Sequence, residues 1–298
     1  MNLLHERLFM FDLHRLRLLR ELRNRGSLAA VAEALGYNPS SVSHQLTILK
    51  REAGTEIFEP HGRSVRLTAA GEMLADSAER LLRELESVQA QVASLSSEVS
   101  GTVRIAAFQT AAHSLLPGVI SQLTRNYPLL KLTFRQLQAE QALPALLAHD
   151  FELVICEEYP GNPLELHPGI NNQTLVKDSL WLATPEDRNI QSLSECVDHD
   201  WIMEPEGTRA RAWALAQCRS AGFEPQVVYE TSDVYTHKRF VDAGLATAFL
   251  PQLILGNTHR YLSTESHRLI SIATRNGAQE TPSLKAVNSA LLEFRGNE

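Results

Sequence analysis

The first part of the chain consists of short amphipathic runs separated by polar breaks. Three runs carry apolar residues at helical spacing, and each follows residues that suit the start of a helix: Asp12, Ser27 and Asn38-Pro39. The expected inward positions are Leu13, Leu16, Leu19, Leu22, Leu28, Val31, Ala32, Leu35, Val42, Leu46 and Leu49. Gly36 suits the end of the second run. The pattern therefore predicts three short helices, the last two joined by a tight turn.

Two strand-like stretches follow the three helices. Glu56–Glu59 and Ser64–Leu67 are rich in apolar or β-branched residues, and a turn over 60–63 with a proline and a glycine separates them. This arrangement predicts a β-hairpin. Residues 1–68 are therefore expected to form a winged helix-turn-helix domain.

The most regular apolar repeat in the chain begins after Thr68. Apolar residues alternate at spacings of four and three, which is typical of a heptad seam, and a helix of this length spans about 40–45 Å. The stripe is narrower than a helix buried in its own domain needs, which favours contact between two chains, although packing within one chain remains the alternative. The predicted dimerisation residues are Leu74, Ala78, Leu81, Leu85, Val88, Val92 and Leu95, within a linker helix assigned to 69–100.

After Gly101 the pattern changes to strands that alternate with helices. Such alternation predicts α/β units with parallel strand pairing, and the length of about 200 residues favours two lobes over one small sheet. The predicted strands are Val103–Phe108, Lys131–Arg135, Leu153–Cys156, Leu180–Thr184, Trp201–Met203, Val227–Glu230 and Leu245–Leu250. The predicted helices are Ser114–Asn126, Glu140–His149, Arg209–Ala221, Val234–Ala243 and Ser283–Phe294. The whole chain is thus an α+β multidomain protein by prediction.

Composition and charge narrow the class of protein. The 298 residues are 44% hydrophobic and 21% charged, as in ordinary globular proteins, and we find no apolar run of transmembrane length and no secretion signal. We therefore expect a cytoplasmic protein without a membrane partner. The net charge of −7 is unevenly distributed: residues 1–70 carry ten basic and seven acidic side chains, so a mildly basic head precedes an acidic body. This distribution suits a nucleic-acid-binding module joined to something else.

The third predicted helix presents a small, uncharged, hydrogen-bonding face. With its apolar residues inward, its outward residues are Ser40, Ser43, His44, Thr47 and Arg51. Short polar side chains can pair with base edges in the major groove, whereas a serine-rich solvated helix would be a poor choice for helix stability. The candidate DNA-binding residues are Ser27, Asn38, Pro39, Ser40, Ser43, His44, Thr47, Arg51 and, in the wing, Arg63 and Arg66. The pattern favours recognition of double-stranded DNA by a helix over 38–51.

Several motifs in order resemble the LysR-type transcriptional regulators. In the head they are Gly26–Leu35, Ser40–Leu46, Phe58-Glu59, Gly62-Arg63 and Arg66–Gly71; later they are Val103–Ile105, Leu115–Pro117, Tyr127-Pro128, Phe151–Ile155, Ala243–Leu245 and Leu250-Pro251. The resemblance covers the whole chain. It implies a homodimer or dimer of dimers held by the linker helices, acting indirectly on RNA polymerase. It also implies an effector-binding domain over 101–298 that is similar to periplasmic binding proteins, with lobe I at about 101–175 and 262–298 and lobe II at about 176–261.

An effector site is expected where strands end and helices begin. In two-lobed α/β folds a ligand lies at the carboxyl ends of strands, facing helix N-termini. The candidate effector-binding residues are Gln109, Thr110, His113, Gln138, Glu157, Gly207, Thr208, Arg209, Ser232 and Asp233. Ordinary capping explains several of these one by one, since Thr208, Ser232 and Asp233 are good caps. Polar residues and helix N-termini favour a small carboxylate or other anion as effector.

The sequence contains no pattern typical of a metal site or of catalysis. The eleven histidines do not form pairs at ligand spacing, and G-x-S-x-G, P-loop and G-x-G-x-x-G motifs are missing, so we expect no metal, no cofactor and no enzymatic activity. Cys156, Cys196 and Cys218 are too scattered for a disulfide framework. The main interpretation is a ligand-responsive DNA-binding regulator. The alternatives are a thiol-switched regulator, or a solute-binding or enzymatic α/β protein with an interaction module.

Overall fold

The computed structural model describes residues 11–61, 64–94, 99–186, 190–255 and 261–294. The chain forms two compact units, one built mainly on residues up to 97 and one on most of the remainder. Each unit is described by itself.

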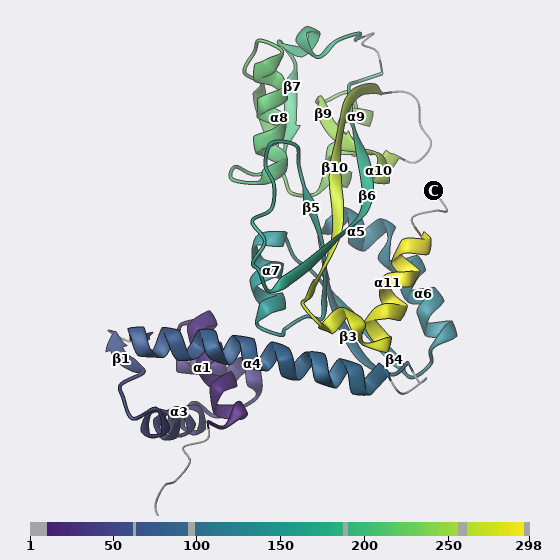
Figure 1. The fold of residues 1–298 in the computed structure, drawn as a ribbon. Coiled ribbons are helices and arrows are strands. Elements are labelled where there is room, and N and C mark those ends of the chain that lie inside the picture. Colours follow the sequence, from purple (N-terminus) through teal and green to yellow (C-terminus); the bar gives the residue numbers. More distant parts are fainter. Residues whose placement is uncertain (1–10, 62–63, 95–98, 187–189, 256–260, 295–298) are drawn as a thin grey trace, which may run out of the picture. The chain divides into compact units, whose positions relative to one another are not determined.

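The first unit contains three short helices, a hairpin and a long helix (Figure 1). These are α1 (Leu13–Arg25), α2 (Leu28–Leu35), α3 (Pro39–Ala53), β1 (Phe58–His61), β2 (Ser64–Leu67) and α4 (Ala69–Ser94). The predicted starts of the first two helices are confirmed, because Asp12 accepts a hydrogen bond from Arg15 N (3.1 Å) and Ser27 accepts one from Ala30 N (3.2 Å). Asn38 occupies the N-cap position of α3 without a capping hydrogen bond from its side chain.

The core of the first unit consists of the apolar faces of these helices. Leu16, Leu19, Leu22, Val31, Ala32, Val42, Leu46 and Leu49 are all buried, as the helical spacing predicts. The prediction is wrong for Leu13, which is 42% exposed at the first turn of α1, and Leu18 is buried instead. Because Val42, Leu46 and Leu49 face inward, the opposite face of α3 is left open to solvent.

The junction between the hairpin and α4 is closely packed. The Thr68 hydroxyl donates a hydrogen bond to Glu56 O (2.7 Å) and accepts one from Gly71 N (3.1 Å), so it ties the strand to the first turn of α4. A Cβ atom on Gly71 would lie 1.8 Å from the Ile57 carbonyl oxygen. Only glycine therefore allows α4 to approach the β1 segment this closely.

The second unit is built on a mixed six-stranded sheet with the strand order β4-β3-β5-β10-β6-β9. From Gly101 the chain contains β3 (Gly101–Ala107), α5 (Gln109–Ser114), α6 (Leu116–Asn126), β4 (Leu130–Gln136), α7 (Ala139–Leu147), β5 (Leu153–Glu158), β6 (Ile170–Ala183), η1 (Leu193–Cys196), β7 (Asp200–Met203), α8 (Arg209–Ser220), β8 (Gln226–Glu230), α9 (Val234–Asp242), β9 (Ala248–Pro251), α10 (Gln252–Leu255), β10 (Leu262–Arg275), η2 (Ala278–Glu280) and α11 (Pro282–Phe294). β3 pairs in parallel with β4 and β5, and β7 pairs in parallel with β8. The expectation of parallel pairing is wrong for β6, which is antiparallel to β9 and β10. β10, which the sequence did not predict as a strand, is also antiparallel to β5.

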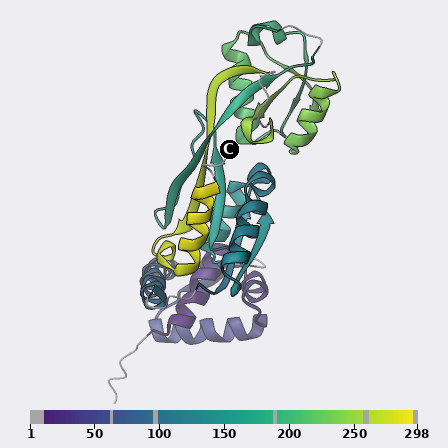
Figure 2. The same ribbon diagram turned by 90° about the vertical axis from the view of Figure 1, so that its right-hand side faces the viewer.

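Two long strands join the two lobes of this unit. β6 and β10 run side by side through its middle, and β7, β8, β9, α8 and α9 gather at their far end (Figures 1 and 2). In the crossing, Asp178 lies opposite Arg268, and the pairing shifts register between Ser263 and His267. The first residues of β10 pair with the end of β6, where β9 also pairs, so β10 begins in lobe II and enters lobe I only later.

Each lobe has its own apolar core. In lobe I, Ala106, Leu143, Leu146, Phe151 and Val154 are buried together. In lobe II, Trp201, Trp213, Met203, Cys196 and Cys218 form one cluster, with Phe249 beside them. The polar groups discussed below lie where these two cores meet the crossing strands.

Candidate DNA-reading face and effector cleft

The solvent face of α3 keeps the polar residues that the sequence predicts. Asn38, Pro39, Ser40, His44 and Arg51 are exposed, and Ser43 and Thr47 are half-buried. The Thr47 hydroxyl donates a hydrogen bond to Ser43 O (2.8 Å), so part of its capacity is used within the helix. Ser27 uses its hydroxyl to cap α2. The face available for hydrogen bonding with a partner is therefore concentrated in the first two turns of α3.

In the wing, Arg66 forms an ion pair with Glu59 across the hairpin. Arg66 Nη2 lies 2.6 Å from Glu59 Oε1, and both side chains are largely exposed. Such an exposed pair is weak and leaves the guanidinium accessible to a phosphate. The predicted wing residue Arg63 lies outside the described residues.

The seam on α4 divides into two parts. Leu81, Leu85, Val88 and Val92 expose between 37% and 63% of their surface, so an apolar stripe on α4 is open. Ala78 is fully buried in the core of the first unit, and Leu74 packs against that core. The assignment of Ala78 to the dimer contact is therefore wrong, because a buried residue of one chain cannot touch a second chain. Leu95 lies outside the described residues.

A cavity of about 260 Å³ lies in the second unit, between α7 and β5 on one side and the start of α8 on the other. Five of the predicted effector residues line it: Gln138, Glu157, Gly207, Thr208 and Arg209. The lining also contains Glu204 and Glu206, which belong to the stretch 204–209 that the sequence places at the cleft in front of the predicted helix. The sequence did not predict the remaining polar members, Glu140 and Tyr159, and no motif or periodicity singles them out.

Arg209 bridges the two lobes across this cavity. Its Nε donates a hydrogen bond to Glu140 Oε1 (2.9 Å) in α7, and its Nη1 donates to Asn162 Oδ1 (2.9 Å) and Pro163 O (2.7 Å) in the loop after β5. The guanidinium is therefore committed to acceptors of lobe I. The residue comes from the first turn of α8, which Thr208 caps by accepting from Arg211 N (3.2 Å).

The other predicted residues gather at a second bridge between the lobes. Gln109 Nε2 in α5 donates to Asp233 Oδ1 (2.6 Å) at the start of α9, and Val234 N donates to Gln109 Oε1 (3.1 Å). The rings of His113 and Tyr235 lie 4.3 Å apart. Partial burial by itself would raise the pKa of Asp233. Hydrogen bonds from Thr236, Gln109 and backbone amides outweigh this effect and hold the pKa below its ordinary value. Ser232 is exposed at the edge of this group.

A buried charge cluster lies at the strand crossing beneath the cavity. Arg268 donates to Asp178 (2.8 Å), to Glu157 (2.5 Å) and to the Thr110 hydroxyl (2.7 Å). Its guanidinium carbon also lies 5.2 Å from the centre of the Phe108 ring. Burial alone would lower the pKa of Arg268, but the charges of Glu157 and Asp178 raise it, so the guanidinium stays charged. Thr110 thus supports Arg268 and is itself buried.

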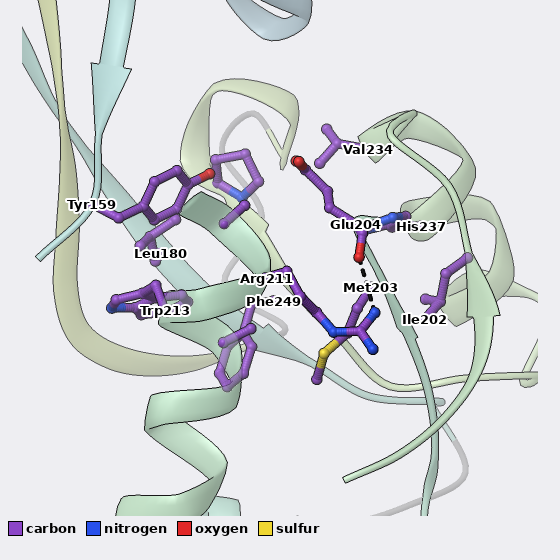
Figure 3. Close-up of a pocket in the computed structure, with 13 residues that line it drawn as sticks. Tyr159, Leu180, Ile202, Met203, Glu204, Arg211, Trp213, Val234, His237 and Phe249 are labelled. Carbon is purple, nitrogen blue, oxygen red and sulfur yellow. Dashed lines mark hydrogen bonds between the residues drawn. The ribbon is translucent and has the colours of Figure 1, made fainter. Parts of the chain in front are cut away.

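Glu204 is a titratable group of the cavity lining whose surroundings strongly alter its pKa. Burial, followed by the charge of Glu157, raises its pKa to about 8. Arg211 Nη1 donates a hydrogen bond to the backbone carbonyl of Glu204 (2.9 Å). In Figure 3 the carboxyl end of Glu204 extends away from that guanidinium. Beside it, an apolar recess of about 30 Å³ is lined by side chains that include Leu180, Trp213 and Phe249 (Figure 3).

The three cysteines lie in apolar surroundings. All are buried thiols outside any disulfide, and burial raises the pKa of Cys156 and of Cys218 to about 12. Thiols in such surroundings are poor nucleophiles at neutral pH. Within the described ranges we find no cluster of three or more residues that could hold a metal ion, and no helix that is both long and apolar enough to cross a membrane.

Comparison with known proteins identifies the family of both domains. The family model for the bacterial regulatory helix-turn-helix protein of the lysR family matches residues 13–72, and that for the LysR substrate binding domain matches residues 96–295. The transcriptional dual regulator GltC of Bacillus subtilis is 25% identical over 252 residues, which cover 83% of both chains.

Two solved structures share the fold. A full-length OxyR variant from Pseudomonas aeruginosa has a TM-score of 0.71 at 20% identity and covers 95% of both chains. CbnR complexed with its target DNA has a TM-score of 0.52 at 18% identity and covers 96% of this chain and all of that one. Together the two family models span nearly the whole sequence, and this chain belongs to the LysR family of DNA-binding transcriptional regulators, with an N-terminal helix-turn-helix and a C-terminal effector-binding domain.

Proposed function

We propose that this regulator binds DNA as a dimer through α3 and is switched by a small molecule held between the lobes of its second unit. The observation that carries the proposal is the cavity of about 260 Å³ whose walls come from both lobes. Ligand sites of α/β proteins lie in such places, at the carboxyl ends of strands.

The bridges across the cleft supply the switch. Arg209 joins α8 to α7, and Gln109 joins α5 to α9, so these contacts form only when the lobes are close. A small molecule in the cavity would gain contacts to both lobes in that state and lose them when the lobes separate. Such differential affinity is what allows a ligand to shift the balance between two conformations.

DNA reading is assigned to the exposed start of α3. Ser40, Ser43 and His44 offer hydrogen-bonding groups suited to base edges, and Arg51 and Arg66 offer charges suited to phosphates. CbnR, which shares the fold, is complexed with its target DNA in its own structure. The wing and the helix would then divide the work between affinity and sequence preference.

The exposed stripe on α4 is assigned to pairing with a second copy of this chain. Leu81, Leu85, Val88 and Val92 repeat at the spacing of a two-chain seam and leave apolar surface open. Two heads joined in this way suit an inverted-repeat site, and two dimers would form the tetramer. The effect on RNA polymerase would follow indirectly from how the bound DNA is held.

We favour ligand control over the thiol-switched alternative, because the three thiols are buried and the pKa values of Cys156 and Cys218 are raised. We also propose that the cleft binds its ligand without turnover. The cations at the cleft already have acceptors: the buried Arg268 donates to Glu157 and Asp178, and the half-buried Arg209 donates to Glu140.

A mobility-shift assay tests the proposed function. Full-length protein is titrated against the DNA upstream of its own coding sequence, and a specific complex is expected at about nanomolar concentration. Folded, dimeric protein that binds no such DNA in any ligand condition would refute the assignment. Equal inhibition of the complex by oxidant in wild type and in a variant lacking all three cysteines would leave the thiol alternative without support.

A further inference from the structure

The charge of the cavity lining is predominantly negative. Four carboxyl groups line it, from Glu140, Glu157, Glu204 and Glu206, against the single guanidinium of Arg209; even with Glu204 mostly neutral at pH 7, the acidic side chains outnumber the basic one. This excess opposes the anionic effector that the helix N-termini favoured at the level of sequence. The start of α8, where an anion would be expected to bind, already has the carboxyl groups of Glu204 and Glu206 nearby. Thr208 also caps this helix start by accepting a hydrogen bond from Arg211 N.

The cations near the cavity are already engaged. Arg209 donates to Glu140, Asn162 and Pro163, and Arg268 lies between Glu157 and Asp178. Neither guanidinium therefore offers a free charge to an incoming carboxylate. A ligand anion at Arg268 would have to displace Glu157 or Asp178 and leave a buried carboxylate without its cation. At Arg209 it would have to compete with Glu140, Asn162 and Pro163.

Glu204 is different, because its carboxyl group has no cation of its own. Within the part of the chain that the structure describes, no Lys, Arg or His nitrogen lies within ion-pair distance of it, and the neighbouring Thr208 hydroxyl donates to Pro205 O (2.9 Å). Arg211, which lies beside it, serves its backbone carbonyl instead. This mostly buried carboxyl group belongs to the lining of both the cavity and the neighbouring apolar recess.

The charged and titratable groups around Glu204 come from every element packed near it. They are Glu157 in β5, Tyr159 just after β5, Glu140 in α7, Arg268 in β10, Glu206 just before α8, Arg209 and Arg211 in the first turn of α8, and His237 in α9. Burial lowers the pKa of His237, which favours its neutral form. The surroundings of the carboxyl group therefore contain more negative than available positive charge.

We propose that the effector of this cleft is a small organic cation, an aliphatic amine or a guanidinium compound, whose charged group binds between Glu204 and Glu157. The cavity volume is below the roughly 300 Å³ at which pockets for larger ligands begin, so the molecule is small. The Tyr159 ring and the adjoining apolar recess suit its hydrocarbon part. This inference rests on the proposed function, since it names the class of ligand for the same cleft.

Binding of such a cation is coupled to a proton. Because the pKa of Glu204 is raised to about 8, the group is mostly neutral at pH 7, and a cation beside it favours the charged form and releases a proton. An anion would have the opposite effect and would cause proton uptake. Amine affinity should therefore rise with pH, by up to about tenfold between pH 6.5 and 7.5, and level off above pH 8.

The experiment is calorimetric titration of the full-length protein with 1,4-diaminobutane, butylamine, L-arginine and guanidine, and with succinate and L-glutamate as anionic probes. Each titration is run in two buffers of different ionisation enthalpy, so that proton release is measured with binding. We expect at least one of the cations to bind with proton release. Failure of all four cations to bind, or tighter binding of succinate with proton uptake, would overturn the proposal.

Matched variants assign the effect to the site. Glu204→Gln should weaken amine binding about tenfold or more and abolish proton release. Glu224→Gln removes the same charge from the exposed pair with Arg219 and should change neither. If Glu204→Gln does not fold, the pH dependence of wild-type binding and the intermediate effect expected for the exposed Glu206→Gln decide the question.

The outcomes separate this inference from the proposed function. A protein that binds its DNA and responds to an anionic ligand, but binds none of the cations, retains the proposed function and refutes the cationic effector. A protein that binds amines with proton release but never binds DNA refutes the DNA-reading assignment and leaves the ligand class standing.

Discussion

Removal of the Arg268 side chain is the sharpest test of the buried charge cluster. Arg268→Met keeps an unbranched apolar chain of similar length but takes the guanidinium away from Glu157, Asp178 and Thr110. Breaking a buried pair by removing one partner typically costs about 3–5 kcal/mol, because the other charge stays buried. At about 2–4 °C per kcal/mol for a domain of this size, the melting temperature should fall by roughly 6–20 °C.

The measurement is denaturant unfolding followed by tryptophan fluorescence. All three tryptophans, Trp181, Trp201 and Trp213, belong to the second unit, so the signal reports on the unit that contains the cluster. Arg219→Met is the matched control, since it breaks an exposed pair with Glu224 and should leave the unfolding midpoint unchanged.

A rescue experiment identifies the cause of the loss. If unpaired buried charge is responsible, adding Glu157→Gln and Asp178→Asn to Arg268→Met should restore most of the stability, because neutral amides cost less to bury than carboxylates. If the triple variant is as unstable as the single one, lost packing of the arginine stem explains the effect. An Arg268→Met variant as stable as the Arg219→Met control would refute the reasoning altogether.

Four further predictions address the other features. Gly71→Ala should destabilise the first unit by about 2–4 kcal/mol in thermal unfolding, because its Cβ would collide with Ile57 O. Leu85→Asp should shift the protein from dimer to monomer in sedimentation experiments while preserving its circular dichroism. His44→Ala should change sequence preference in DNA binding, whereas Arg66→Ala should weaken binding to all sequences and lower the salt dependence. Because the folded state raises the pKa of Glu204 to about 8, wild-type stability should fall between pH 5 and 8 by up to about 1 kcal/mol per unit, and Glu204→Gln should lack this slope in denaturant unfolding.

The sequence predicts the first unit well because its structure is local. Asp12 and Ser27 mark helix starts within a few residues of the atoms they bond, and Val42, Leu46 and Leu49 alone orient α3. The error at Ala78 has a local origin too. A heptad pattern identifies a stripe on a helix but not what covers it, and a small residue inside a stripe of leucines also suits close packing within one chain.

The second unit is less predictable because its key contacts are distant in sequence. β6 and β10 contain polar runs, Asn171–Thr174 and Ser263–His267, so their apolar pattern does not identify two strands of 14 residues each. Arg268 was missed for this reason, since it meets Glu157 and Asp178 across 111 and 90 residues. Single positions such as Thr208 and Asp233 could be predicted because helix starts have a local signature. The balance of charge in the cavity could not be predicted, because it depends on which helix starts face one another in the fold.

The position of the carboxylates also connects ligand charge with closure of the lobes. Glu157 lies in β5 of lobe I, whereas Glu204 precedes α8 in lobe II, and after burial the charge of Glu157 raises the pKa of Glu204. Without a cation, bringing the lobes together confines two carboxyl groups in a space where only one is charged at neutral pH. A cation between them would remove this cost only when both are near, so it would bind the closed state more tightly than the open one. The switch requires that difference in affinity between the two states. An anion in the same cavity would instead bind the open state more tightly than the closed one.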